Sequence, residues 1–120
     1  MAGYVEGFVV HVPADKNEAY RAMAAMAAPI FRDHGALRVV ECWGDDVPKG
    51  KTTDFWTAVK AEPGEIVVFS RIEWPSKAAR DEGMAKAMRD PRMQIPPERL
   101  PFSGARMIYG GFVTVLDTAE

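Results

Sequence analysis

Cysteine is almost missing from this sequence: Cys42 is the only one among 120 residues, so no intrachain disulfide can form. This favours a reducing compartment, and we expect a cytoplasmic protein. Long hydrophobic runs are missing too, since no stretch approaches the roughly 20 apolar residues that a membrane-spanning helix needs. No positively charged segment precedes the first apolar run, as it would in a secretory signal. Neither a membrane partner nor secretion is therefore predicted.

An excess of one charge is also lacking. Fifteen basic residues are interspersed with seventeen acidic ones, which gives a formal net charge of −2. Proteins that bind nucleic acid normally carry a cationic face that displaces counterions from phosphates, so RNA and DNA are disfavoured as partners.

Motifs for metals and cofactors are absent as well. Two separated histidines and one cysteine make no recognisable zinc set. The sequence contains no phosphate-cradling glycine loop, no nucleophile elbow and no Cys-x-x-Cys pair. We predict no metal site and no cofactor.

What the sequence does contain is the composition of a folded domain, with 48% hydrophobic and 27% charged residues. We predict a single domain over residues 1–120. Hydrophobic periodicity gives the order strand, helix, strand, strand, helix, strand. The predicted strands cover residues 3–12, 36–43, 66–74 and 106–116, and the predicted helices run from Asp15 to Gly35 and from Ser76 to about Arg89.

Several signals locate the ends of these elements. Asp15, with Glu18 three residues later, predicts the cap of the first helix. Pro29 lies inside that helical pattern, so a kink or loosening is expected there. Residues 55–61 are ambiguous, and a strand is favoured over a short helix. Residues 91–104 hold four prolines and predict a long loop with little regular structure, which is often a functional feature.

The βαββαβ order predicts an α+β fold with a ferredoxin-like antiparallel sheet and both helices on one face. The last two strands are apolar on both sides, whereas a sheet with one solvated face normally alternates apolar and polar residues. The second face therefore needs a cover, most simply another copy of the chain. We predict a homodimer, a dimeric α+β barrel, with an interface of at least ~1,200 Å².

Long motifs also resemble a known family. They are residues 39–48 (VVECWGDDVP), 53–55 (TDF), 67–70 (VVFS), 74–76 (WPS), 90–93 (DPRM) and 101–112 (PFSGARMIYGGF). Together they resemble the YbaA-like family of small bacterial proteins of unknown function, over nearly the whole chain. One departure is Arg71, where an aromatic residue is expected.

The resemblance implies the dimeric α+β barrel superfamily, which agrees with the two-faced sheet. That superfamily includes cofactor-independent monooxygenases, haem-degrading and haem-peroxidase relatives, isomerases and members with no known activity. The family itself brings no established activity and no catalytic residue to this chain.

Glu41 and Trp43 are the most informative candidate site residues, because they share a strand face with apolar neighbours. A carboxylate on such a face must be paired or protonated, and its pKa tends to rise. Glu41 is therefore a candidate general base or ligand anchor. The alternative is a structural ion pair with an arginine, for which Arg71, Arg38 and Arg106 are the candidates.

Three further residues complete a candidate pocket near the sheet: Arg71, Tyr109 and His11. They combine aromatic and ionisable side chains on strand faces, and the proline-rich loop could close over them. His34 is expected to act as a polar group at the end of the first helix. The catalytic residues, if any, are not identified by the sequence.

Three hypotheses follow for function. The first is a dimeric protein that binds a small molecule in a pocket near the sheet. The second is an enzyme that resembles cofactor-independent monooxygenases or isomerases and uses the same pocket. The third is a non-catalytic stress or scaffold dimer, in which the same strand faces are only core and interface.

Overall fold

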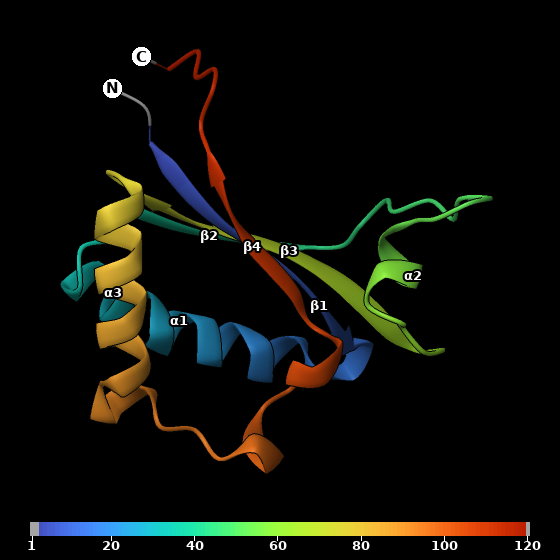
Figure 1. Cartoon of the computed structure of the whole chain (residues 1–120). Helices are drawn as coiled ribbons and strands as arrows, with labels where there is room; N and C mark the ends of the chain where they lie inside the picture. The colour runs from blue at the N-terminus through green and yellow to red at the C-terminus, as the bar shows by residue number, and fades with distance from the viewer. Residues whose placement is uncertain (1–2, 120) are drawn as a thin grey trace.

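The computed structural model describes residues 3–119 and contains one four-stranded antiparallel sheet (Figure 1). Its strands are β1 (Tyr4–Pro13), β2 (Arg38–Trp43), β3 (Glu65–Trp74) and β4 (Ile108–Val113), in the spatial order β2-β3-β1-β4. This is the ferredoxin-like sheet that the βαββαβ pattern predicts, so the predicted α+β fold class is confirmed.

The two long helices, α1 (Asn17–Asp33) and α3 (Lys77–Arg89), lie on the same side of the sheet (Figure 1). A one-turn helix, α2 (Phe55–Ala58), lies on the opposite side at one end. Four 3₁₀ turns join these elements: η1 (Ala14–Lys16), η2 (Pro91–Met93), η3 (Pro97–Arg99) and η4 (Gly104–Arg106). No helix among the described residues is long and apolar enough to cross a membrane.

The strand favoured for residues 55–61 is wrong, because this segment begins with α2. The Asp54 carboxylate accepts the backbone N–H of Thr57 at 2.6 Å, which caps the helix. The Trp56 indole donates to the Val47 carbonyl at 2.9 Å and holds the turn in place. These local hydrogen bonds, which hydrophobic periodicity does not report, favour the short helix.

Other boundaries also differ from the sequence prediction. Asp15 lies in η1 and does not cap α1, whose N-terminus has no side-chain cap. Helix α1 continues four residues beyond Pro29, which is exposed. The last strand is shorter than residues 106–116, and the predicted loop 91–104 contains 3₁₀ turns. The Ser76 cap of α3, with its hydroxyl accepting from Ala79 N–H at 3.1 Å, is confirmed.

The helix-covered face of the sheet carries most of the core. Val10, Val12 and Val68 are buried with Tyr20 of α1 in one cluster. In a second cluster, Trp74 is fully buried with Ile72 and Ala36. Helix α3 reaches Trp74 through a glycine: a Cβ at Gly83 would collide with the Trp74 ring. These contacts fix both helices against the strands.

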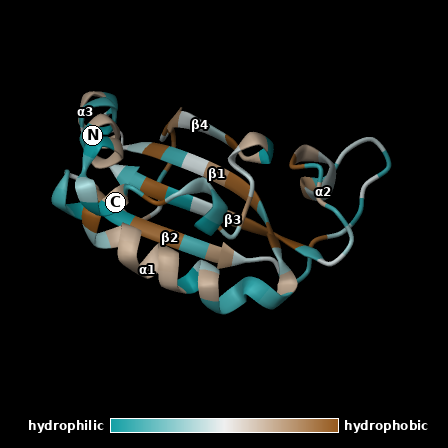
Figure 2. Cartoon of the chain, turned by 90° about the horizontal axis from the view of Figure 1, so that it is seen from below, coloured by the Kyte–Doolittle hydropathy of each residue, from teal (hydrophilic) through white to brown (hydrophobic). Residues whose placement is uncertain are grey.

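The opposite face is covered only at one end, where α2 and the segment after it pack on the sheet. The rest of this face is open and apolar, with Phe69, Ile108 and Phe112 between 43% and 63% exposed. Hydrophobic positions occur along all four strands (Figure 2). The sheet therefore presents an uncovered hydrophobic face, as the two-sided strand patterns predicted.

Candidate functional site

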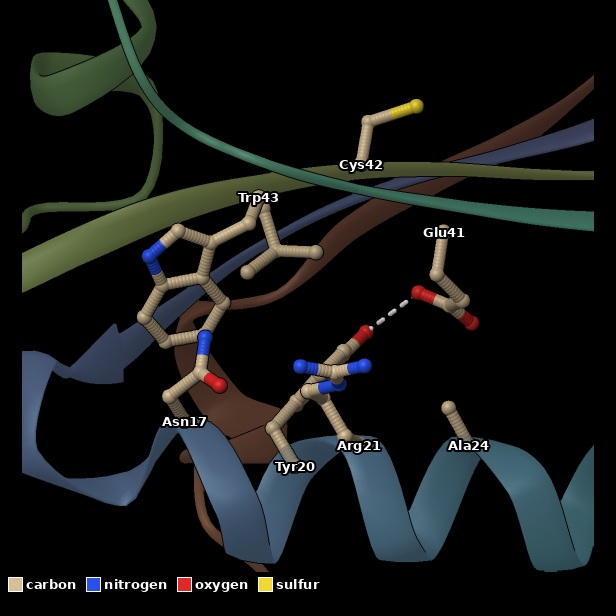
Figure 3. A pocket seen from close by; sticks show the side chains of 8 residues that line it. Asn17, Tyr20, Arg21, Ala24, Glu41, Cys42 and Trp43 are labelled. Atoms are coloured by element: carbon tan, nitrogen blue, oxygen red, sulfur yellow. Dashed lines mark hydrogen bonds between the residues drawn. The ribbon is translucent and has the colours of Figure 1, made fainter.

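A cleft of about 430 Å³ separates the first half of α1 from β2 on the helix-covered side (Figure 3). Its walls come from α1, from β2 at the edge of the sheet and from the neighbouring β3. The lining residues are Asn17, Tyr20, Arg21 and Ala24 from α1, Glu41, Cys42 and Trp43 from β2, and Val68 from β3.

A short hydrogen bond crosses this cleft from α1 to β2. The Tyr20 hydroxyl donates to Glu41 Oε1 at 2.6 Å (Figure 3). The pairing of β2 with β3 sets Glu41 opposite Ser70 and turns its side chain toward α1. Tyr20 lies near the N-terminus of α1 and is buried. The bond therefore links the helix to the sheet edge.

The electrostatic setting of this pair is unusual for a carboxylate. No salt bridge reaches Glu41 from any residue between 3 and 119. Burial raises the pKa of the Glu41 carboxyl, although hydrogen bonds from Tyr20 and Ser70 lower it in part. Burial, and then the nearby Glu41 charge, raises the pKa of the Tyr20 phenol. Tyr20 thus keeps its proton and donates a hydrogen bond to Glu41.

Aromatic rings hold Tyr20 from both sides. The Trp43 ring centroid lies 6.3 Å from that of Tyr20, and the Phe102 centroid lies at the same distance in an edge-on arrangement. Trp43 extends toward Asn17, while Cys42 points away from the cleft (Figure 3). The cleft thus offers an aromatic wall, a carboxyl group and, at Arg21, a cation.

Of the five residues predicted for one pocket, the structure brings Glu41 and Trp43 together. Arg71 lies on the opposite face of the sheet, where its Nε donates to Glu73 at 2.8 Å. The alternative of an ion pair between Glu41 and an arginine is therefore wrong. Tyr109 lies on β4, exposed, with its ring 6.5 Å from that of Phe8.

His11 lines a second cleft of about 450 Å³, formed where residues 97–106 pack beside β1 and the start of β3. The ring is fully enclosed: its Nδ1 is 3.1 Å from Glu65 Oε2, and its Nε2 accepts the Ser103 backbone N–H at 3.1 Å. Arg106 donates two bonds to the same Glu65 carboxylate, at 3.0 and 3.1 Å. These contacts tie residues 101–106, here named the clasp loop, to β1 and β3.

The charge of Glu65 is stabilised by these neighbours. The Arg106 guanidinium, a backbone N–H and His11 together hold the pKa of the Glu65 carboxyl at about 2, against an ordinary value of 4.5. The second cleft therefore contains a charged carboxylate that is paired with an arginine, and a histidine whose two ring nitrogens both have hydrogen-bond partners. Both groups are used to hold the chain together.

Sequence reasoning missed the residues that α1 contributes to the first cleft. Tyr20 precedes Met23 and Ala24 by three and four positions, so it lies on the inward stripe of the helix. A stripe that begins at Ala19 would fit the same helical spacing, but Ala19 is exposed. His34, predicted as a helix-end group, follows α1 and has its Nε2 3.0 Å from Asp90. Among residues 3–119 no group of three metal-ligating side chains occurs.

The sheet order and helix placement define a ferredoxin-like α+β protein. Residues 3–104 match the family described as "Protein of unknown function (DUF1428)", and the chain belongs to that family. It is 63% identical over 114 residues to the uncharacterised protein YbaA of Escherichia coli K12, covering 95% of this chain and 97% of that protein. YbaA of Shigella flexneri matches to the same extent. The predicted YbaA-like membership is confirmed.

Two solved structures share a similar chain course at low sequence identity. One is a putative antibiotic biosynthesis monooxygenase from Nitrosomonas europaea, with a TM-score of 0.48, 13% identity and coverage of 93% of this chain and 88% of that one. The other is a mutant of SnoaB, a cofactor-independent oxygenase from Streptomyces nogalater, with a TM-score of 0.48, 15% identity and coverage of 99% and 97%. Similarity at this level leaves the chemistry of the present chain open.

Proposed function

We propose that this protein binds a small molecule in the cleft between α1 and β2. The observation that supports this most is the Tyr20–Glu41 pair, a carboxyl group with a raised pKa and no cationic partner among the described residues. Glu41 is an exposed residue that a ligand can reach, and partial desolvation of its carboxyl group is what raises the pKa. Perturbed groups of this kind gather at functional sites.

The lining of the cleft indicates the chemistry of the ligand. Trp43 supplies an aromatic face, on which a planar ring can stack. Arg21 supplies a cation, which favours an anionic substituent. Each carboxylate oxygen can accept more than one hydrogen bond, so Glu41 can accept one from a ligand O–H or N–H in addition to those from Tyr20 and Ser70. A small aromatic acid that carries a hydroxyl or amino group fits all three.

The test is a titration with 4-hydroxybenzoate, followed by NMR signals of the Trp43 indole and the Tyr20 ring and by calorimetry. Arg21→Ala is expected to weaken binding about tenfold, which corresponds to about 1.4 kcal/mol for one charge-assisted contact. The matched control is Arg38→Ala, which removes an exposed arginine on the opposite face of β2. Equal weakening in both variants, or no response at Trp43 and Tyr20, would contradict the proposal.

We prefer binding to catalysis because the Glu41 carboxyl is already engaged by a phenol that retains its proton. The alternative, an activity like those of cofactor-independent monooxygenases or isomerases, would use Glu41 as a general base in the same cleft. Incubation in oxygenated buffer, followed by mass analysis and NMR spectroscopy of the recovered compound, separates the two, because an oxygenated product gains mass and an isomer changes its spectrum. An unchanged ligand supports binding, and a converted one supports the enzyme.

We also propose that the open face of the sheet pairs with that of a second copy. Phe69, Ile108 and Phe112 form an exposed hydrophobic area there. The charges between them are already neutralised, since Arg71 pairs with Glu73 on the same face. A surface with little net charge can meet its own copy about a two-fold axis without repulsion. The exposed, free Cys42 on this face suits the reducing cytoplasm that we propose as the location.

Light scattering after size exclusion tests the dimer. The unmodified chain is expected to elute at twice the chain mass of 13.3 kDa. Phe112→Glu places a charge at the centre of the proposed interface and is expected to give a monomer. Val115→Glu, in the exposed segment after β4, is the control and should leave the dimer intact. A monomeric unmodified chain would contradict this proposal and favour neither binding nor catalysis.

A further inference from the structure

The clasp loop covers a part of β1 that no strand pairs on that side. β4 pairs with β1 only from Tyr4 to Val9, although β1 continues to Pro13. The chain that returns from α3 reaches this place, next to the junction between β1 and α1, before it enters β4 (Figure 1). The clasp loop therefore lies at the edge of the sheet, within reach of both faces.

Two adjacent residues of the clasp loop contact opposite faces of the sheet. Phe102 packs on the helix-covered face, against the cluster of Val10, Val12 and Tyr20. Its ring meets the Tyr20 ring edge-on at 6.3 Å. Ser103 lies on the other face, where its N–H donates to His11. Because these residues are neighbours in the chain, a bond that fixes Ser103 also limits where Phe102 can move.

The bond requires one protonation state of the histidine. Ser103 N–H points at Nε2, so this nitrogen must offer a lone pair, and the ring proton sits on Nδ1 and faces Glu65. Protonation at Nε2 would set two N–H donors against each other. The charged groups that face His11 are Glu65 from β3, Arg106 from η4 and Lys16 from η1.

We propose that His11 is a positioning residue for the Tyr20–Glu41 cleft. Its neutral form accepts the hydrogen bond from Ser103 N–H, here named the latch, which holds Phe102 against Tyr20. Protonation of His11 breaks this hydrogen bond. The latch is independent of any ligand. Only its effect on affinity rests on the proposed function, since it assumes that the cleft binds a small molecule.

A matched pair of variants separates the two nitrogens of the ring. His11→Asn keeps a donor near the Nδ1 position for Glu65 but removes the acceptor for Ser103. His11→Gln keeps an acceptor near the Nε2 position. Hydrogen exchange of the Ser103 amide is expected to become at least about tenfold faster in His11→Asn, with a concurrent shift of the Tyr20 ring signals. His11→Gln should remain close to the unmodified protein in both readouts.

The unmodified protein provides a second test that needs no variant to fold. Histidine commonly changes charge between pH 8 and pH 5, whereas lysine and arginine keep theirs. Glu65, with a pKa of about 2, also keeps its charge. As the pH falls through this interval, the Ser103 amide should lose protection, and the Tyr20 signals should follow the ¹⁵N signals of His11. His11→Gln should show neither change.

Two results would overturn the proposal. If Ser103 exchange accelerates in His11→Asn while the Tyr20 signals stay in place, the clasp loop is anchored by His11 without influence on the cleft. If Ser103 stays protected down to pH 5, protonation does not release the latch. Should 4-hydroxybenzoate fail to bind the unmodified protein, the proposed function falls, while the Ser103 and Tyr20 readouts still decide on the latch.

Discussion

Glu41 and Glu65 line two clefts of similar size, and their surroundings move their pKa values in opposite directions. Glu65 receives two bonds from Arg106 and faces His11, so its charge is stabilised. Glu41 receives a hydrogen bond from an uncharged phenol, and burial raises its pKa. Glu65 thus forms a structural ion pair that joins distant parts of the chain. Within residues 3–119, Glu41 has only uncharged hydrogen-bond partners, and it can still interact with a ligand.

The comparison shows why cleft volume alone does not identify a site. Both clefts contain aromatic and ionisable residues, but in the second cleft the carboxylate and the histidine both have partners within the chain. Only the first leaves a carboxyl group without a charged partner among the described residues. Three substitutions test this difference between Glu41 and the ion-paired Glu65.

Glu65→Gln should have the largest effect, a loss of about 2–3 kcal/mol in the free energy of unfolding at pH 7. The folded pKa of about 2 lies below the ordinary 4.5, so the native state favours the charged form. Its contribution is present above about pH 4.5 and is lost as the pH falls toward 2. Urea unfolding at pH 7 and pH 3.5 should therefore show the deficit of the variant shrinking in acid. A constant deficit would attribute the loss to packing.

Tyr20→Phe should cost about 1–2 kcal/mol, because the Glu41 carboxylate loses its hydrogen bond from the phenol while the ring contacts remain. Denaturant unfolding at pH 7 measures the loss. Tyr109→Phe, which removes an exposed hydroxyl beside Phe8, is the control and should change stability by less than about 0.5 kcal/mol. Equal values for both variants would mean that the Tyr20 hydroxyl contributes nothing.

Glu41→Gln should have the smallest effect on the free energy of unfolding. It should stabilise the protein, whereas the other two substitutions destabilise it. The folded pKa of Glu41 is raised, so its native state favours the protonated form, and its contribution is lost as the pH rises through that pKa. The variant should therefore gain stability relative to the unmodified chain between pH 4 and pH 7, by less than about 1 kcal/mol. If the variant instead becomes less stable than the unmodified chain as the pH rises, the native state favours the charged form of Glu41, as it does for Glu65.

Alternation along the strands was enough to predict the sheet, its two apolar faces and the placement of Glu41 and Trp43 on one side. The same alternation could not place Arg71, because which face it takes relative to Glu41 depends on the pairing of Val40 with Arg71. That register comes from the whole sheet. An ion pair between Glu41 and Arg71 was therefore reasonable from sequence and wrong in the structure.

Contacts between distant parts of the chain were beyond the reach of sequence patterns. His11 meets Glu65 and Ser103, which lie 54 and 92 residues further along. No periodicity reports such separations. Tyr20 is a different case, since its spacing to Met23 and Ala24 placed it on the inward stripe. It was missed because a stripe that begins at Ala19 fits the same helical spacing, and only the structure shows that Ala19 is exposed and Tyr20 buried.

The short pairing of β4 with β1 has a consequence for how the protein avoids self-association. Beyond Val9, β1 would present an unpaired strand edge, which is a template for strand addition by other chains. The clasp loop occupies that edge, and Pro13 at its end offers no N–H to an incoming strand. The hydrogen bond between Ser103 and His11 thus also shields this edge, and His11→Asn, which removes it, should become turbid under conditions in which the unmodified protein stays clear.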